Sequence, residues 1–179
     1  SFVIQSWDTA SKDGLTNSFS VCTTWLRHDG SYYLIDVCRK KLNFPTLRDI
    51  ARELSKQYKP RYILIEDAST GPALASELKF TVSSIIKLIK PKEDKRIRLF
   101  AQQADFAAGR VWFPRQAPWL RLFLEELLGF PGGRYSDQVD SLSQALAFKS
   151  GYDIEALNKG LAALLEPRVF GYGFRPGWL

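Results

Sequence analysis

The chain has no methionine, one histidine and two cysteines among its 179 residues. Both cysteines, Cys22 and Cys38, lie inside apolar runs, which is typical of buried reduced thiols and argues against a disulfide framework. His28 stands in a polar turn, with no cysteine or second histidine at a metal-ligand spacing, so the sequence disfavours a zinc centre. We therefore expect a protein of a reducing compartment whose chemistry depends on other side chains.

Long apolar runs are also lacking. No stretch approaches the roughly 18 apolar residues that a membrane-spanning helix needs. The first residues show no charged-then-apolar signal pattern. These absences predict a cytoplasmic protein that makes no membrane contact. Because methionine is missing altogether, we also expect the chain to be a piece of a longer protein.

The charges that are present are mostly basic. Lys and Arg number 25 against 19 Asp and Glu, which gives a formal net charge of +6. Such a surplus favours a polyanionic partner such as nucleic acid, although a basic protein without such a partner also fits. Since 45% of the residues are hydrophobic, the chain can bury the core of one domain.

Hydrophobic periodicity predicts an alternation of strands and helices. Apolar runs of strand type lie at Phe2–Trp7, Ser18–Arg27, Ser31–Cys38, Arg61–Ile65, Ser84–Ile89 and Val111–Phe113. Helical spacing predicts helices at Pro45–Tyr58, Pro72–Leu78, a basic helix through Arg98 and Phe106, then Trp119–Leu128 and Asp137–Phe148. This order predicts an α/β fold with a central mixed β-sheet flanked by α-helices.

Four carboxylates stand where ligand sites form in such folds. Asp8 follows the first predicted strand and Glu66 the fourth, so both belong to the carboxyl edge of the sheet. Periodicity does not choose between Glu66 and Asp67, because adjacent side chains point to opposite faces of a strand. Asp137 and Asp140 are three residues apart at the start of a helix and share one side of it. We expect these acids to meet at one edge.

Such a cluster predicts a site for hard divalent cations. Crowded carboxylates repel one another unless cations neutralise them, and Mg²⁺ or Mn²⁺ prefers oxygen ligands. Two ions about 4 Å apart can activate a water molecule for attack on a phosphodiester. Each acid also has an ordinary alternative, because strand-end carboxylates often cap turns and Asp137 can cap its own helix.

Basic residues are densest after the fifth predicted strand. The candidates for DNA contact are Lys90, Lys92, Lys95 and Arg98. Phosphate contacts from such side chains give salt-sensitive binding that is independent of base sequence. Acidic residues are interspersed in the same stretch, so a solvated helix face is the alternative.

Three motifs together resemble the nuclease domain of tailed-bacteriophage terminase large subunits. They are Gln5–Ala10, Leu64–Asp67 and Asp137–Leu142. The resemblance covers residues 1–150, and implies a ribonuclease H-like nuclease domain there, followed by a C-terminal tail at 151–179 that we expect to be partly helical and then irregular. It further implies that Asp8, Glu66 and Asp137 bind metal, with Asp140 as a further candidate.

The resemblance also implies a biological role. Terminase large subunits cut concatemeric viral DNA in the cytoplasm of the bacterial host while the genome is packaged. An ATPase motor domain precedes their nuclease, and the portal and the small terminase subunit are further expected partners. This chain contains no phosphate-binding loop of the kind that ends in Lys-Ser or Lys-Thr, so we expect no ATP hydrolysis from it.

Two departures from the family pattern stand near the acids. Tyr135-Ser136-Asp137 replaces the His-Asp-Asp that is common before the final helix, and Ala68 replaces the lysine that often follows Glu-Asp. Two other functions remain open at this point. One is a nuclease like the Holliday-junction resolvases, which share the same kind of acid pattern, and the other is a non-catalytic module that docks on DNA or on the portal.

Overall fold

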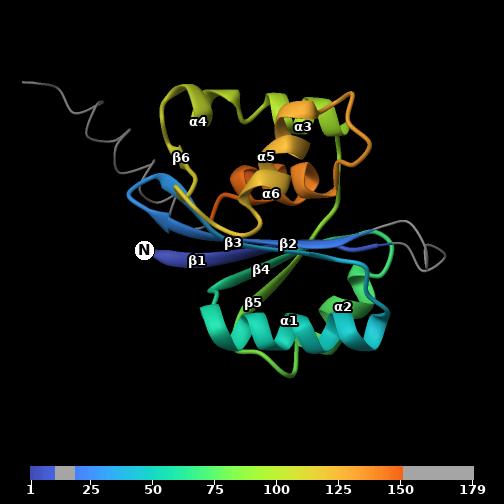
Figure 1. Cartoon of the computed structure of the whole chain (residues 1–179). Coiled ribbons are helices and arrows are strands. Elements are labelled where there is room, and N and C mark those ends of the chain that lie inside the picture. The colour runs from blue at the N-terminus through green and yellow to red at the C-terminus, as the bar shows by residue number, and fades with distance from the viewer. Residues whose placement is uncertain (11–18, 151–179) are drawn as a thin grey trace, which may run out of the picture. The chain divides into compact units, whose positions relative to one another are not determined.

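A six-stranded sheet forms the centre of this computed structural model, which describes residues 1–10 and 19–150 (Figure 1). The strands are β1 (Phe2–Asp8), β2 (Ser20–His28), β3 (Ser31–Lys40), β4 (Tyr62–Glu66), β5 (Ile85–Ile89) and β6 (Val111–Trp112). Their order across the sheet is β5-β4-β1-β2-β3-β6. β2 pairs antiparallel with β1 and β3, whereas the β1–β4, β4–β5 and β3–β6 pairs are parallel. The predicted mixed sheet is confirmed.

Helices cover both faces of the sheet. They are α1 (Phe44–Tyr58), α2 (Gly71–Leu78), α3 (Lys95–Phe100), α4 (Gln103–Ala107), α5 (Leu120–Gly129) and α6 (Asp137–Ala147). In Figure 1, α1 and α2 lie on one face and the other four helices on the opposite face. One buried cluster includes Trp7, Leu47 and Leu74, and a second includes Trp25 and Phe123. The sheet therefore separates two apolar layers.

Local signals explain where α1 begins and ends. The Asn43 side chain accepts a hydrogen bond of 3.0 Å from the backbone N–H of Thr46, which satisfies a free donor of the first turn. At the other end, Lys59 adopts a left-handed conformation with φ of 47°. Its neighbour Pro60 cannot continue a helix. Leu47 and Ala51, one turn apart, are buried against the sheet.

The single basic helix predicted through Arg98 and Phe106 is wrong, because the chain forms two short helices there. Between α3 and α4, the Gln102 side chain donates a hydrogen bond of 3.2 Å to the Arg98 carbonyl. The backbone N–H of Gln102 bonds to the Leu99 carbonyl instead, at 2.9 Å. The side chain thus occupies the carbonyl that helix continuation would use, and the turn tightens.

α6 is fastened across β1 and β2 by polar contacts. The Ser141 hydroxyl donates to the Ser6 carbonyl at 2.7 Å and accepts from the backbone N–H of Thr23 at 3.2 Å. The Gln144 amide donates to the Ser6 hydroxyl at 2.9 Å. Side chains alternate along a strand, so Asp8 lies on the same face of β1 as Ser6. The first turn of α6 therefore lies beside the carboxyl end of β1.

Two further expectations concern the C-terminal tail and the lack of a membrane-spanning helix. The predicted tail at 151–179 lies outside the described residues. Within the described ranges, no helix combines the length and the apolar character needed to cross a bilayer.

Candidate functional site

The four predicted acids lie within electrostatic reach of one another. Asp8 and Glu66 end the neighbouring parallel strands β1 and β4, and Asp137 and Asp140 occupy the first turn of α6. Burial raises the pKa of Asp8 well above its usual value, and the negative charges of Glu66, Asp140 and Asp137 raise it further. The structure thus brings all four side chains to one edge of the sheet.

The pKa values of Glu66 and Asp137 are raised as well. Burial raises the pKa of Glu66, an effect that the nearby Arg98 opposes and Asp140 reinforces. Burial also raises the pKa of Asp137, with the charge of Glu126 acting in the same direction and Lys95 acting against it. Three carboxyls with raised pKa values form a region that favours added positive charge.

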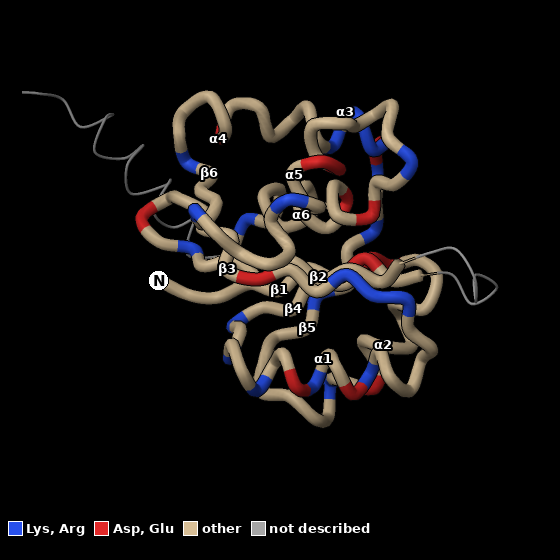
Figure 2. Tube along the Cα trace, in the orientation of Figure 1, with Lys and Arg blue, Asp and Glu red and all other residues tan. Residues whose placement is uncertain are grey.

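Two cations of α3 already enter this region. The Asp140 side chain is 1% exposed, and its two oxygens accept hydrogen bonds from Lys95 and from Arg98, the latter at 2.8 Å from Nη2. Lys95 also donates to the Ser136 hydroxyl at 3.1 Å, and Arg98 Nη1 lies 4.0 Å from a Glu66 oxygen. Figure 2 shows basic and acidic segments meeting beside α3.

The charge of Lys95 is itself favoured by these contacts. Burial lowers the pKa of Lys95, but the hydrogen bond and the charge of Asp140, followed by the charges of Asp8 and Asp137, raise it above its usual value. Lys95 and Arg98, both predicted as DNA contacts, therefore face the acids in this structure. Lys90 and Lys92 are exposed in the segment between β5 and α3.

The donor set fits a hard divalent cation. It consists of carboxylate oxygens only, and it lacks the thiolates and imidazoles that zinc prefers. As the side chains stand, no group of three or more Asp, Glu, His or Cys residues in the described ranges is arranged to hold an ion. In this arrangement Lys95 and Arg98 both pair with Asp140.

Two charged neighbours of Asp137, Glu126 and Arg39, are not predicted from the sequence. Glu126 of α5 is buried and accepts hydrogen bonds from the backbone and the side chain of Gln138. Arg39 of β3 lies 3.4 Å from the same carboxylate. Helical spacing offers one signal for Glu126, since it stands three residues after the buried Phe123 and so shares its face.

The capping alternative for Asp137 is wrong. Ser136 occupies the N-cap position of α6, and Asp137 is the first helical residue. Ser136 makes no capping bond with its side chain, and its hydroxyl accepts from Lys95 instead. Asp137 is therefore available to the acid cluster.

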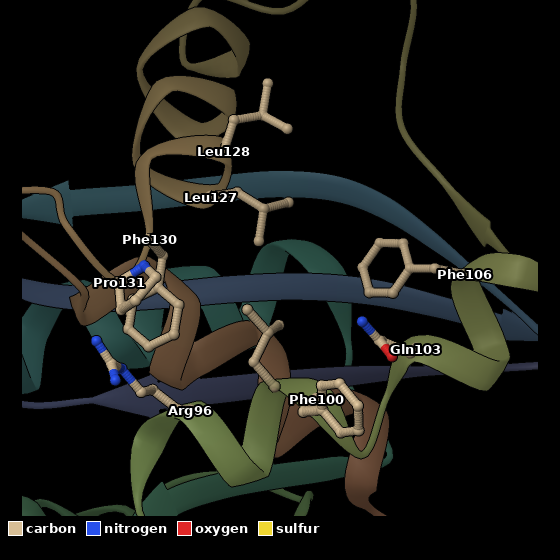
Figure 3. Close-up of a pocket in the computed structure, with 9 residues that line it drawn as sticks. Arg96, Phe100, Gln103, Phe106, Leu127, Leu128, Phe130 and Pro131 are labelled. Carbon is tan, nitrogen blue, oxygen red and sulfur yellow. The ribbon is translucent and has the colours of Figure 1, made fainter.

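A cavity of about 630 Å³ lies elsewhere, between α3, α4 and the end of α5 (Figure 3). Its lining is mostly apolar and consists of Arg96, Leu99, Phe100, Gln103, Phe106, Leu127, Leu128, Phe130 and Pro131. None of the described residues that line it carries a carboxylate, a thiol or an imidazole. The acid cluster is the better candidate for a reaction site.

A mixed sheet with helices on both faces, and with acids at the ends of β1 and β4 and at the start of α6, places this protein in the ribonuclease H-like class. The family described as "Terminase RNaseH-like domain" matches residues 5–148. The chain therefore belongs to the family of terminase ribonuclease H-like domains.

Solved structures with this fold come from several viruses. The large terminase nuclease from the thermophilic phage G20c is similar with a TM-score of 0.64 at 19% identity, over 83% of this chain and 82% of that chain. A mutant gp2c of the large terminase subunit from bacteriophage Sf6 has a TM-score of 0.64 at 11% identity, over 83% of this chain and 89% of that chain. The fowlpox virus Holliday junction resolvase has a TM-score of 0.50 at 16% identity, over 81% of this chain and 96% of that chain. Among curated proteins, no relative matches the chain.

Proposed function

We propose that this domain is a metal-dependent endonuclease that cuts concatemeric viral DNA during genome packaging. The observation that carries the proposal is the meeting of Asp8, Glu66, Asp137 and Asp140 at one edge of the sheet, where three of them have raised pKa values. Family membership supports it, because the family is that of terminase domains. In this proposal the domain acts in the cytoplasm of the bacterial host, together with an ATPase motor domain, the portal and the small terminase subunit.

Asp8, Glu66 and Asp137 would hold Mg²⁺ or Mn²⁺, with Asp140 as a further ligand. A pair of such ions supplies an activated water and stabilises the leaving oxygen of a phosphodiester. Related structures support a divalent ion, since the G20c nuclease was solved with zinc and with magnesium and the Sf6 subunit with calcium. The chain's own acids orient the ions, and its buried setting limits competing water.

Lys90 and Lys92 supply contacts to the DNA backbone in this proposal. Both are exposed and lie between β5 and α3, the helix that enters the acid cluster. Positive side chains at this place bind phosphates without reading bases. Lys95 and Arg98, which pair with Asp140 here, would join them when a bound ion compensates the charge of Asp140.

Plasmid cleavage tests the proposal. Full-length chain with millimolar Mn²⁺ or Mg²⁺ is expected to nick or linearise supercoiled plasmid, and chelation of the metal is expected to stop it. Asp8→Asn and Glu66→Gln should abolish cleavage while both variants still melt cooperatively. The control is Asp67→Asn, an exposed carboxylate next to Glu66, which should cleave like the wild type. Cleavage that persists in both site variants rejects the assignment.

The second candidate function is resolution of branched DNA. The fold likeness to the fowlpox virus resolvase favours it, and that enzyme was also solved with Holliday junction DNA. A preference for four-way junctions over linear duplex in the same assay would support this alternative. A third outcome, DNA binding with neither cleavage nor a change of melting temperature in Mn²⁺, would indicate a non-catalytic module.

A further inference from the structure

Two adjacent glutamates of α5 have opposite environments. The Glu125 side chain is 56% exposed and pairs with Arg121 one turn earlier, at 2.6 Å. The Glu126 side chain is only 6% exposed. A buried carboxylate is costly unless hydrogen bonds and opposite charge compensate it, so the burial of Glu126 calls for a specific set of partners.

Glu126 finds these partners at the start of α6. One of its oxygens accepts from the backbone N–H of Gln138 at 2.7 Å, and the other accepts from the Gln138 side-chain amide at 2.6 Å. The first N–H groups of a helix have no partner within the helix and are usually satisfied by the N-cap side chain. Ser136 makes no such bond. Glu126 therefore caps α6 from a neighbouring helix.

Arg39 completes the arrangement. Its guanidinium lies 3.4 Å from Glu126, 3.5 Å from the ring centroid of Phe19 and 4.8 Å from that of Tyr135. The two rings meet edge to face, with centroids 5.4 Å apart. Cation–π contacts on both rings hold Arg39 in place. The compensating charge for Glu126 is thus fixed by residues that immediately precede α6 and β2.

The capped turn is the turn that carries two acids of the cluster. Asp137 precedes Gln138 directly, and Asp140 follows within the same turn. The backbone N–H of Asp140 donates a hydrogen bond of 3.0 Å to the Ser136 carbonyl. Because a helix turn moves as a unit, a bond that fixes the N–H of Gln138 also fixes the direction in which both aspartates project.

We propose that Glu126 is a positioning residue for the candidate metal site, which caps α6 in place of Ser136 and thereby aims Asp137 and Asp140. Both oxygens of Glu126 bond to Gln138, so Glu126 acts on the site through the first turn of α6. This inference rests on the proposed function, because the site that it positions is the proposed metal site. Partners behind the ligands commonly set metal affinity in this way.

The test compares Glu126→Gln and Glu126→Ala with Glu125→Gln in the full chain. Titration calorimetry with Mn²⁺ should show affinity reduced by about 10- to 100-fold in Glu126→Ala, the range for loss of a partner behind a metal ligand. Glu126→Gln should fall between this variant and the wild type, since an amide keeps one acceptor but turns a second donor toward Gln138. Glu125→Gln should bind like the wild type, because its pair with Arg121 is exposed.

A second measurement needs no metal. Hydrogen exchange followed by mass spectrometry should show faster exchange of the peptide that contains the first turn of α6 in Glu126→Ala, and no change in Glu125→Gln. If Glu126→Ala lowers the melting temperature but leaves Mn²⁺ affinity intact, Glu126 is merely structural and the inference is overturned. Unchanged exchange overturns it too. A wild type that binds no Mn²⁺, with exchange altered as expected, supports the capping role and rejects the proposed function.

Discussion

Asp140 shows how one buried carboxylate can depend on charges from a distant part of the chain. Its side chain is 1% exposed and bonds to both Lys95 and Arg98 of α3. Arg98 is the more buried of the two cations, at 17% exposure, and it also approaches Glu66. An unpaired charge in such a place would carry its full desolvation cost. Arg98 therefore stabilises the metal-free site.

We expect Arg98→Ala to lower the free energy of unfolding of the metal-free protein by about 1–3 kcal/mol, the cost of leaving a buried polar group short of a partner. Urea denaturation in the presence of a chelator measures this free energy of unfolding. The variant should also gain more stability from Mn²⁺ than the wild type does, because an added cation then replaces a missing one. The matched control is Arg96→Ala, since Arg96 makes no ion pair with another described residue. Equal stability of the two variants would contradict this role.

The acids are predictable from the sequence, but their pairing with Lys95 and Arg98 is not. Asp8 and Glu66 were recognisable because each ends an apolar strand, and the parallel pairing of β1 with β4 does bring them to one edge. Lys95 and Arg98 precede Asp140 by 45 and 42 residues. No local pattern indicates contacts over such separations, so the sequence alone predicts a DNA surface from this basic run. Whether these two side chains also contact DNA stays a prediction.

At the scale of elements, Gly71 sets how closely α2 approaches β4. A Cβ atom at this position would lie 2.0 Å from the backbone oxygen of Glu66 and 3.1 Å from a methyl carbon of Ile65. The backbone oxygen cannot move aside without moving the strand end. Gly71 is therefore needed for space, at the place where β4 presents Glu66 to the acid cluster.

We expect Gly71→Ala to destabilise the protein by about 1–3 kcal/mol, as overpacking does. A loss of stability would be informative, because replacing glycine by alanine normally stabilises a helix by about 1 kcal/mol. Gly129→Ala in α5 is the matched control, since no atom lies within 4 Å of the added Cβ, and it should be neutral or stabilising. Urea denaturation and the shift of melting temperature with Mn²⁺ measure both variants. A Gly71→Ala protein as stable as Gly129→Ala would show that α2 can shift freely.

Element positions were largely predictable, and their interruptions were not. The predicted β4 at Arg61–Ile65 and the observed Tyr62–Glu66 differ by one residue at each end, because a short apolar run flanked by polar residues marks a buried strand well. The break between α3 and α4 depends on one side chain, that of Gln102, which bonds to the backbone of Arg98. Helical periodicity continues through such a break and does not reveal it.

At the scale of the whole molecule, the charge surplus is unevenly distributed. The formal net charge is +6, yet the acid cluster gathers four carboxylates, of which Asp140 pairs with Lys95 and Arg98 and Glu66 lies 4.0 Å from Arg98. Under the proposed function, DNA approaches a site whose centre is acidic and which lies beside the basic residues of α3 (Figure 2). Attraction must come from the exposed cations beside the site, and Lys90 and Lys92 are the candidates between β5 and α3.

Salt dependence of DNA binding tests this division of charge. Anisotropy of a fluorescent duplex, measured in a chelator so that no cleavage occurs, gives the slope of log affinity against log salt concentration. Each phosphate contact contributes about 0.9 to this slope, so Lys90→Ala and Lys92→Ala should each reduce it by about that amount and weaken binding to all sequences alike. Glu66→Gln should leave the slope unchanged and tighten binding, because it removes a repulsive charge from the centre of the site.

The control for these variants is Lys56→Ala, an equally exposed lysine on α1, which covers the opposite face of the sheet (Figure 1). Its net charge change is identical, so any effect of overall charge appears in it as well. If Lys90→Ala and Lys92→Ala shifted the slope no more than Lys56→Ala, the attraction would be a property of the whole molecule and not of the surface beside the acids. A slope that falls only in the first two variants would locate the DNA backbone next to α3, within reach of the side chains that bond to Asp140.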